Sequence, residues 1–489
     1  MDLHEGKLMT LFDRIDDWLV GNVGFPLTSD LMNRKGVLNT YRDMIASERR
    51  TEEELREMQL RKLQNVLRHA YDYCFFYKQR FDEAGITPDN IRTMDDLRKL
   101  RPLSRKEIIQ RGDDMVDARY ADSIRVAQHS GRGPGQPIPF GRFRHHQLVR
   151  NTSSGSTGAP VTFYENGSTT AANWAFELRL RHWFGFEPGV REARMARVSA
   201  DYVPGGAMNW MRKRLWHQLM LPGVNLADKE YAIALDKIRA FRPRVLWGFT
   251  SALVGLADFI NRIGVDISTC RPELAIGWAA PVYEHEERTL KEVFRCAVTN
   301  IYGAREVGHI AALCPEHVWH INQEHVLLEC NDDDPTAERG ELLVTVLEPS
   351  PMPFIRYRLG DIGRPAPSDC ACGRKLSVLK DFLGRTGEIF TTKDGRMIAP
   401  NFWCRFFMVD GQSQFVERFQ VVYRQSDEVD IRIVKKPGFS EQTEADMLRI
   451  LRKNFSHEIH FHFNYVPNIE PQISGKYQMV VNELQRSES

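Results

Sequence analysis

The 489-residue chain has few of the features that mark a protein for export, for a membrane or for nucleic acid. It has no uninterrupted apolar run approaching the roughly 18 residues that a transmembrane helix needs. Its first residues, MDLHEGKLMTLFDRIDDWLV, lack the basic start and clean apolar stretch of a signal peptide. The 66 Lys and Arg residues balance 65 Asp and Glu residues, so no excess positive charge is available to neutralise nucleic-acid phosphates. We therefore expect a cytoplasmic protein with no membrane span and no nucleic-acid partner.

Cysteine is also scarce, with eight residues in the whole chain. A disulfide scaffold would need a far higher density, so scattered cysteines such as Cys74 are expected to be buried thiols in a reducing compartment. The segments CPEHVWH (314–320) and CACGR (370–374) differ, because thiolates and imidazoles in two short clusters suit a closed tetrahedral zinc.

This zinc site would be structural. The favoured ligands are Cys314, His320, Cys370 and Cys372, with His317 as the competing imidazole. The alternative is a set of reduced thiols that stand beside chance histidines.

The composition that remains is ordinary for a globular protein, with 42% hydrophobic and 27% charged residues. A charged helical pattern runs over 51–115. Between 171 and 323, helix-like runs alternate with short apolar runs such as RVLWGF and ELAIGW, which predicts an α/β core with a partly parallel sheet. From 339 the pattern is rich in β-strands. The tail after 384 reads strand, strand, helix, strand, which predicts a small α+β domain.

The segment SSGSTGAP (153–160), followed by the strand-like VTFYE, is rich in glycine and hydroxyl groups. Glycine lets backbone N–H groups point inward, so such a loop can form a nest for a polyphosphate. It is not a P-loop, because no Lys follows the second glycine. A flexible turn is the alternative. The candidate phosphate-binding residues are Ser153, Ser154, Gly155, Ser156, Thr157 and Gly158.

Three shorter segments follow in order. In YGARE (302–306), an aromatic ring beside Gly303 can stack on a purine, and the carboxylate of Glu306 can hold Mg²⁺. In YRLGD (357–361), Asp361 can accept hydrogen bonds from both hydroxyls of a ribose. The pairs Gly384-Arg385 and Gly475-Lys476 come later. Each segment alone is better explained as a strand end, a tight turn or a surface charge.

In this order the five segments resemble the adenylate-forming superfamily of acyl-CoA synthetases, and within it the phenylacetate–CoA ligase family, including relatives from capsular-polysaccharide gene clusters. The resemblance runs from about Leu55 to Glu483 and includes GELLVTVLEPSPMPFIRYRLGDIG and ISGKYQMVVNEL. It implies a large α/β N-terminal domain with mixed sheets (1–386), in the adenylate-forming enzyme fold, and a small mobile α+β C-terminal domain (387–489).

The resemblance implies an enzyme that activates a carboxylic acid in two steps. ATP and the acid give an acyl-adenylate and pyrophosphate, and the CoA thiol then displaces AMP. Residues 153–158 would hold the β- and γ-phosphates, and Tyr302 would stack on adenine. Glu306 would bind Mg²⁺, Asp361 with Arg385 would hold the ribose, and Lys476 would bridge the carboxylate and the α-phosphate.

Three departures from the family pattern leave the second step open. The hinge position that usually carries Asp is Gly387, and the position that usually carries a hydroxyl before the metal carboxylate is Arg305. Ala279-Ala280-Pro281 stands where relatives often have an acidic residue. A transfer of the acyl group to an amine, a sugar or a carrier protein is therefore the first alternative to CoA. A non-catalytic nucleotide-binding relative is the second, although Glu306, Asp361 and Lys476 argue against it.

The sequence gives less information about the acyl pocket than about the other expected sites. Its candidate residues are aromatic, which suits an aryl or otherwise bulky acid, although aromatic residues in an α/β core can be core alone. These candidates are Phe140, Trp247, Phe249 and Trp278. The expected partners are a small carboxylic acid and CoA or another acceptor, and the sequence leaves a homodimer open.

Overall fold

A computed structural model describes most of the chain. The described residues are 11–29, 36–124, 137–138, 148–153, 161–196, 210, 213–224, 226–331, 339–385, 390–391, 397–398, 402–403, 406–407, 414–425, 427–455, 459–470 and 479–483.

The largest element is an eleven-stranded mixed sheet, in the order β11-β12-β13-β14-β10-β9-β8-β7-β6-β4-β5. Its strands are β4 (Glu192–Ala196), β5 (Gln218–Pro222), β6 (Val245–Phe249), β7 (Leu274–Trp278), β8 (Ala297–Ala304), β9 (Gly308–Leu313), β10 (Trp319–Ile321), β11 (Val326–Asn331), β12 (Gly340–Val346), β13 (Tyr357–Ala366) and β14 (Val378–Arg385). The strands from β5 to β8 are parallel, and every pair from β8 to β11 is antiparallel. The partly parallel core is therefore present, and β8 is the strand that both halves share.

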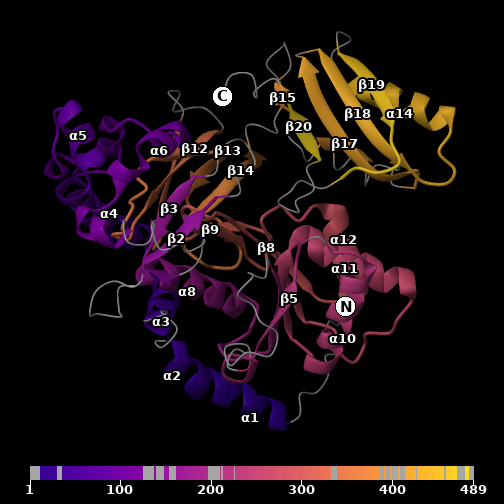
Figure 1. Ribbon diagram of the computed structural model, residues 1–489, viewed down its shortest axis with the longest axis horizontal. Helices are drawn as coiled ribbons and strands as arrows, with labels where there is room; N and C mark the ends of the chain where they lie inside the picture. Colours follow the sequence, from indigo (N-terminus) through magenta and orange to yellow (C-terminus); the bar gives the residue numbers. More distant parts are fainter. Residues whose placement is uncertain are drawn as a thin grey trace.

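Helices cover both faces of the parallel half, as Figure 1 shows. Leu246 and Ala275 face a cluster made with α10 (Asp228–Phe241), α11 (Thr250–Ile263) and α12 (Glu284–Phe294). Their neighbours Trp247 and Ile276 belong to the opposite cluster, with α8 (Gly167–Trp183) and α3 (Val37–Ser47). Because successive strand residues point to opposite faces, short and continuously apolar strands are what a sheet buried on both faces requires.

Helices near the start of the chain cover the antiparallel half. The long helix α4 begins after Thr51, whose side chain and Glu54 form a reciprocal capping box. Its apolar face is buried at Leu63, Val66 and Leu67 against strands of the sheet. The other elements of this region are α1 (Leu11–Leu19), η1 (Val20–Gly24), α2 (Phe25–Ser29), α4 (Glu52–Tyr73), α5 (Phe75–Glu83), α6 (Arg105–Arg111) and the short turns η2 (Pro88–Asn90), η3 (Asp95–Lys99), η4 (Gly112–Met115) and η5 (Ala118–Tyr120).

A small three-stranded antiparallel sheet carries the start of the glycine-rich segment. It consists of β1 (Pro137–Ile138), β2 (Leu148–Thr152) and β3 (Thr162–Glu165). The segment 153–160 follows β2 directly and connects it to β3. The sheet therefore fixes both ends of the expected phosphate loop.

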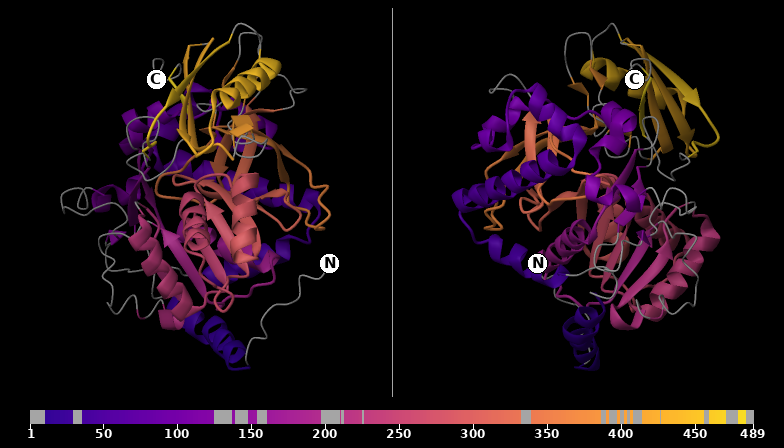
Figure 2. Two further views of the ribbon diagram at one scale, coloured as in Figure 1. Left: turned by 90° about the vertical axis from the view of Figure 1, so that its right-hand side faces the viewer. Right: turned by 60° about the vertical axis from the view of Figure 1, so that its left-hand side comes forward.

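The tail forms a separate layered body with its own core, which Figures 1 and 2 show apart from the large sheet. Its four-stranded sheet has the order β19-β18-β17-β20. The elements are β15 (Phe390–Thr391), β16 (Met397–Ile398), β17 (Val416–Gln425), β18 (Glu428–Lys435), α14 (Glu441–Asn454), β19 (His460–Tyr465) and β20 (Val480–Asn482). The expected α+β order is present, and β20, which the sequence pattern did not reveal, pairs in parallel with β17.

The large sheet ends at Arg385, and β15 of the next sheet begins at Phe390. The expected domain boundary between 386 and 387, and Gly387 itself, lie outside the described residues. Among those that are described, no helix combines the length and the apolar character needed to cross a bilayer.

Candidate functional site

Two residues expected at the adenosine meet across the large sheet. Tyr302 lies near the end of β8 and Asp361 in β13, and the tyrosine hydroxyl donates a hydrogen bond of 2.7 Å to the Asp361 carboxylate. The ring of Tyr302 lies 4.4 Å, centroid to centroid, from Phe382 of β14. Three strands separate β8 from β13 in the sheet, so this contact depends on the tertiary fold.

Strand register brings a third expected residue to the same place. Asp361 and Arg385 are direct partners in the antiparallel pair β13–β14, although the side chain of Arg385 lies outside the described set. Gly303 has a local reason to be glycine, because an added Cβ would lie 2.4 Å from the carbonyl oxygen of Gly308. The tight β8–β9 connection therefore requires this glycine without any ligand.

Ser153 closes the neck of the expected phosphate loop. Its backbone N–H donates to the carbonyl of Val161 at 2.8 Å, and its Oγ accepts from the N–H of Val161 at 2.9 Å. Ser154, Gly155, Ser156, Thr157 and Gly158 lie outside the described residues.

Glu306, the expected magnesium ligand, lies in the turn between β8 and β9 with its side chain 8% exposed. Nη1 of Arg105, the first residue of α6, is 3.5 Å from its carboxylate. Nη2 of the same guanidinium donates to Ser153 Oγ at 3.0 Å. One arginine therefore contacts both the expected metal carboxylate and the start of the expected phosphate loop.

Arg105 was missed by the sequence reasoning. The local signal is the capping pattern around Ser104, whose side chain and Glu107 cap the start of α6. That pattern predicts a helix start, but nothing in it connects Arg105 to a serine 48 positions later.

Arg305 occupies the position where a hydroxyl residue is usual. Its Nη1 donates to the backbone carbonyl of Thr152 at 2.8 Å. This bond ties the turn that carries Glu306 to the strand that ends beside Ser153. The substitution therefore places a second arginine next to the expected phosphate loop.

Two of the expected acyl-pocket residues lie together at the carboxyl ends of parallel strands. The rings of Phe249 (β6) and Trp278 (β7) are stacked 5.4 Å apart, with an interplanar angle of 29°. Ligands of open α/β sheets bind at such strand ends. Ala279 follows at once with φ of 65°, a left-handed conformation that is strained for a residue with a Cβ. Phe140 lies outside the described residues.

Trp247 lies one step deeper in β6 and is 1% exposed. The guanidinium of Arg194 is 4.7 Å from its ring and 4.6 Å from the ring of Trp174. Arg194 also forms ion pairs with Glu177 and Glu192, both of them buried. Trp247 is thus part of a buried aromatic and charged layer behind the strand ends.

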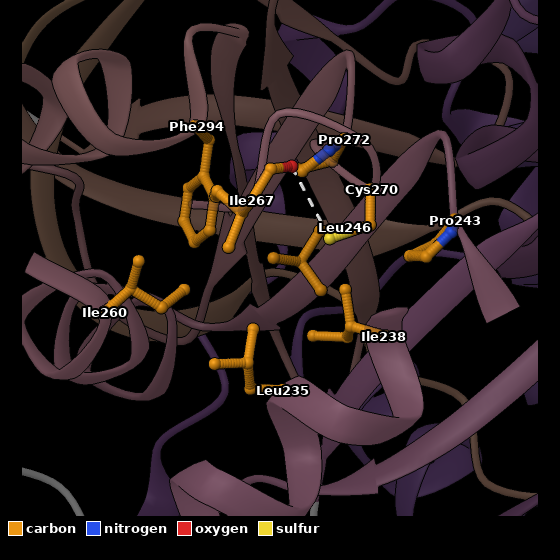
Figure 3. A pocket seen from close by; sticks show the side chains of 9 residues that line it. All are labelled: Leu235, Ile238, Pro243, Leu246, Ile260, Ile267, Cys270, Pro272 and Phe294. Carbon is orange, nitrogen blue, oxygen red and sulfur yellow. Dashed lines mark hydrogen bonds between the residues drawn. The ribbon is translucent and has the colours of Figure 1, made fainter. Parts of the chain in front are cut away.

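Two cavities mark other regions of the described chain. One of about 10 Å³, shown in Figure 3, is enclosed by apolar side chains of α10, α11, α12 and β6, and it has room for about one water molecule. The other, of about 480 Å³, lies between α6 and the hairpin β2–β3 and is lined in part by Arg111, Arg150 and Tyr164. Neither cavity is lined by Trp247, Phe249 or Trp278.

The four favoured metal ligands come together. One ligand atom from each lies within 4.8 Å of all the others, although the residues come from the end of β9, from β10 and from the β13–β14 turn. These residues are Cys314, His320, Cys370 and Cys372. The sulfurs of Cys314 and Cys370 are 3.7 Å apart, which is too far for a disulfide. Tetrahedral bonds of about 2.3 Å to a shared zinc would place two sulfurs about 3.8 Å apart.

His320 is oriented for coordination. Its Nδ1 lies 3.1 Å from the carbonyl of Leu376, which accepts that proton, and its Nε2 faces Cys372 at 3.2 Å. A metal-bound histidine typically donates its other N–H in this way. Burial lowers the pKa of His320 to about 4, so the ring is neutral at pH 7.

His317, the competing imidazole, lies apart from the cluster. Its side chain is 54% exposed, and its Nε2 is 3.8 Å from Glu287. The cysteines and histidines of segments 314–320 and 370–374 therefore fit one closed site with four ligands, in which His320 is the imidazole ligand. Lys476, the remaining expected catalytic residue, lies outside the described residues.

Comparisons with known proteins find relatives of this chain. Residues 390–483 match the family model of the CapK C-terminal domain. The phenylacetate-coenzyme A ligase of Pseudomonas putida is 27% identical over 353 residues, which cover 68% of this chain and 71% of that protein. Protein CapK of Staphylococcus aureus is 21% identical over 356 residues, which cover 70% and 76% of the two chains.

The fold is found in a solved enzyme structure. A 2-hydroxyisobutyryl-CoA ligase in complex with R3-HIB-AMP aligns with a TM-score of 0.64 at 18% identity, covering 90% of this chain and 93% of that one. The expected fold class is thereby confirmed. In its motifs, its fold and these relatives together, the chain is similar to the phenylacetate–coenzyme A ligases, which are adenylate-forming enzymes.

Proposed function

We propose that this chain uses MgATP to activate a carboxylic acid as an acyl-adenylate and then transfers the acyl group to CoA. The observation that carries the proposal is the convergence of residues from distant segments. Tyr302 meets Asp361, and Glu306 and Ser153 meet at Arg105. These contacts join the two expected adenosine residues to each other, and the expected metal carboxylate to the start of the expected phosphate loop, although the residues come from distant parts of the chain.

The chemistry explains why these groups are useful. A carboxylate is a poor electrophile, and adenylation gives it AMP as a leaving group. Glu306 would hold Mg²⁺, which neutralises phosphate charge, because carboxylate and phosphate oxygens are the ligands that this ion prefers. Asp361 would orient the ribose, and Tyr302 would offer its ring to adenine. Lys476, from a C-terminal domain that begins near 387 and rotates between steps, would meet the reacting carboxylate.

The proposed acid is aryl or otherwise bulky. The stacked pair Phe249 and Trp278 supports this class, because a large apolar surface stands at the strand ends where substrates of such sheets bind. A small aliphatic acid would leave this surface poorly covered.

The test is pyrophosphate release from MgATP with a panel of aryl, fatty and hydroxy acids, each with and without CoA. Release that depends on the acid would establish adenylation and name the substrate class. Formation of the acyl-CoA thioester would identify the acceptor. A protein that binds ATP yet releases no pyrophosphate with any acid would be the non-catalytic relative.

A second acceptor class has its own support. The match of residues 390–483 is to the CapK C-terminal domain, the part of the chain that would meet the acceptor. An amine, a sugar or a carrier protein could therefore take the place of CoA. Acid-dependent pyrophosphate release that yields no thioester, together with acyl transfer to an amine or a sugar hydroxyl, would favour this alternative.

The cluster of Cys314, His320, Cys370 and Cys372 is proposed to bind structural zinc. It would tie the β9–β10 hairpin to the β13–β14 turn and so brace the strands that carry Asp361. The cytoplasm remains the proposed location, supported by the described cysteines, which form no disulfide with one another. A homodimer remains an untested prediction.

A further inference from the structure

We infer that Arg105 binds the β- and γ-phosphates of MgATP, and that Ser153 and Glu306 hold it in place in the free protein. The inference rests on the proposed adenylation and deepens it. Arg105 belongs to none of the motifs from which that activity is argued, and it comes from α6 on a different part of the chain.

The position of the guanidinium is the first argument. Its two terminal nitrogens contact the first residue of the expected phosphate loop at 3.0 Å and the expected metal carboxylate at 3.5 Å. Its side chain is 28% exposed, whereas that of Glu306 is 8% exposed. The arginine is therefore the more accessible member of this ion pair.

The charges of the site give the second argument. Mg²⁺ and Arg105 cannot both take the full charge of Glu306, so a metal that arrives with the triphosphate displaces the guanidinium from its anion. Phosphate oxygens are the best replacement, because the planar fork of arginine binds them with two parallel hydrogen bonds. Arg305 donates to the backbone carbonyl of Thr152, whereas Arg105 contacts both the expected metal carboxylate and the start of the expected phosphate loop.

The start of α6, which carries Arg105, is held by contacts of its neighbouring residues. Ser104 and Glu107 cap the helix reciprocally, and the backbone N–H of Leu103 donates to the carbonyl of Arg356 at 2.8 Å. A fixed Cα with a long side chain suits a residue that passes from a carboxylate to a phosphate over a few ångströms.

The test compares Arg105→Met, Arg105→Lys and the control Arg101→Met by isothermal titration of the full-length protein. Arg101 is 56% exposed and pairs with Glu107 near the same helix start, away from Ser153 and Glu306. Arg105→Met should weaken MgATP and magnesium pyrophosphate by about tenfold or more, the value of a charge-assisted hydrogen bond. AMP, which lacks both outer phosphates, should change by less than about twofold. Arg105→Lys should recover part of the lost MgATP affinity.

Two results would overturn the inference. Parallel losses of MgATP and AMP affinity would make Arg105 a structural residue, and unchanged MgATP affinity would make it a surface ion pair. The proposed function fails in a different way, when the wild-type protein shows the expected nucleotide binding but releases no pyrophosphate with any acid.

Discussion

The hydroxyl of Tyr302 donates to the carboxylate of Asp361 over 2.7 Å, although 59 positions separate the two residues. The bond joins the residue expected to meet adenine to the residue expected to meet the ribose. It also fixes the rotamer of a carboxylate that is otherwise 8% exposed. A nucleoside would therefore meet an acceptor that is already oriented.

Tyr302→Phe tests this coupling, because it keeps the ring and removes the donor. A net hydrogen bond of about 1 kcal/mol corresponds to about a fivefold rise in the KM for ATP, measured by pyrophosphate release. Tyr41→Phe is the control, since that hydroxyl bonds to Glu187 away from the site. An unchanged KM for ATP in Tyr302→Phe would show that the bond does not orient Asp361 for the nucleotide.

Zinc should co-purify with the protein at about one ion per chain, as a closed four-ligand site predicts. Cys372→Ser should lose it, as measured by elemental analysis, and should unfold at lower temperature. Free zinc at one hundred times Kd contributes about 2.7 kcal/mol to the free energy of unfolding through mass action. Cys330→Ser, at a cysteine outside the cluster, should retain the ion. If wild-type protein without zinc were as stable as the zinc-bound protein, the assignment of a structural zinc site would be contradicted.

Lys476→Ala separates the two proposed half-reactions. Adenylation should fall by about 10²- to 10³-fold, because a cation that stabilises developing phosphate charge is removed. Thioester formation from supplied acyl-adenylate should remain close to wild type, since Lys476 is proposed to act in only one domain orientation. Lys435→Ala, in β18 of the same domain, is the control. If both half-reactions fall together, the two-orientation model is wrong.

Arg194 should be a major contributor to stability. Burial alone would raise the pKa of Glu177, but Arg194 and His309 outweigh it and hold that pKa well below its ordinary range. Arg194→Met would leave Glu177 and Glu192 without their shared cation, at a cost of about 3 to 5 kcal/mol in the free energy of unfolding.

Chemical denaturation measures this cost. Arg262→Met is the control, because that side chain is 59% exposed and pairs with an exposed Asp228. It should leave the free energy of unfolding almost unchanged. Similar losses in the two variants would show that the buried network has no special role.

Glu165 should make stability depend on pH near neutrality. Burial raises its pKa from 4.5 to about 7, against the opposing hydrogen bond from Asn151 and the charge of Arg305. Between these two values the folded chain keeps a proton that the unfolded chain has lost. Stability therefore falls as pH rises from 4.5 to 7, and the loss is complete above the folded pKa.

Glu165→Gln removes this titration. Its unfolding temperature, relative to that of the wild type, should be higher at pH 8 than at pH 5, because only the wild type must bury a charge at pH 8. The difference in the free energy of unfolding should be on the order of 1 to 3 kcal/mol. Identical pH profiles for the two proteins would falsify the assignment.

Much of the fold follows from local patterns. The runs RVLWGF and ELAIGW predicted β6 and β7, because a strand buried on both faces is continuously apolar. The charged helical pattern of 51–115 predicted α4. β20 was missed because it has three residues, Val480–Asn482, and exists only through its pairing with β17. A strand held by a distant partner leaves little trace in its own sequence.

The candidate site shows the same limit. The metal cluster was predictable, since cysteine and histidine are rare and their spacing carries information, and geometry then separated His320 from His317. Arg105 was not predictable, because nothing in the sequence distinguishes it from the other arginines. Only the fold brings it into contact with Ser153 and Glu306. Trp247, expected in the acyl pocket, could be distinguished from Phe249 only by its depth in the sheet.

The sheet changes from parallel to antiparallel at β8. The residues expected to bind the acid and those expected to bind the ribose therefore lie in different halves of one sheet. The aromatic pair Phe249 and Trp278 belongs to the parallel half, whereas Asp361 and Arg385 belong to the antiparallel half. Substitutions in β6 and β7 can therefore accumulate without touching the strands that would hold the nucleotide. Proteins built on this sheet can therefore change the acid that they accept while they keep the same nucleotide-binding strands.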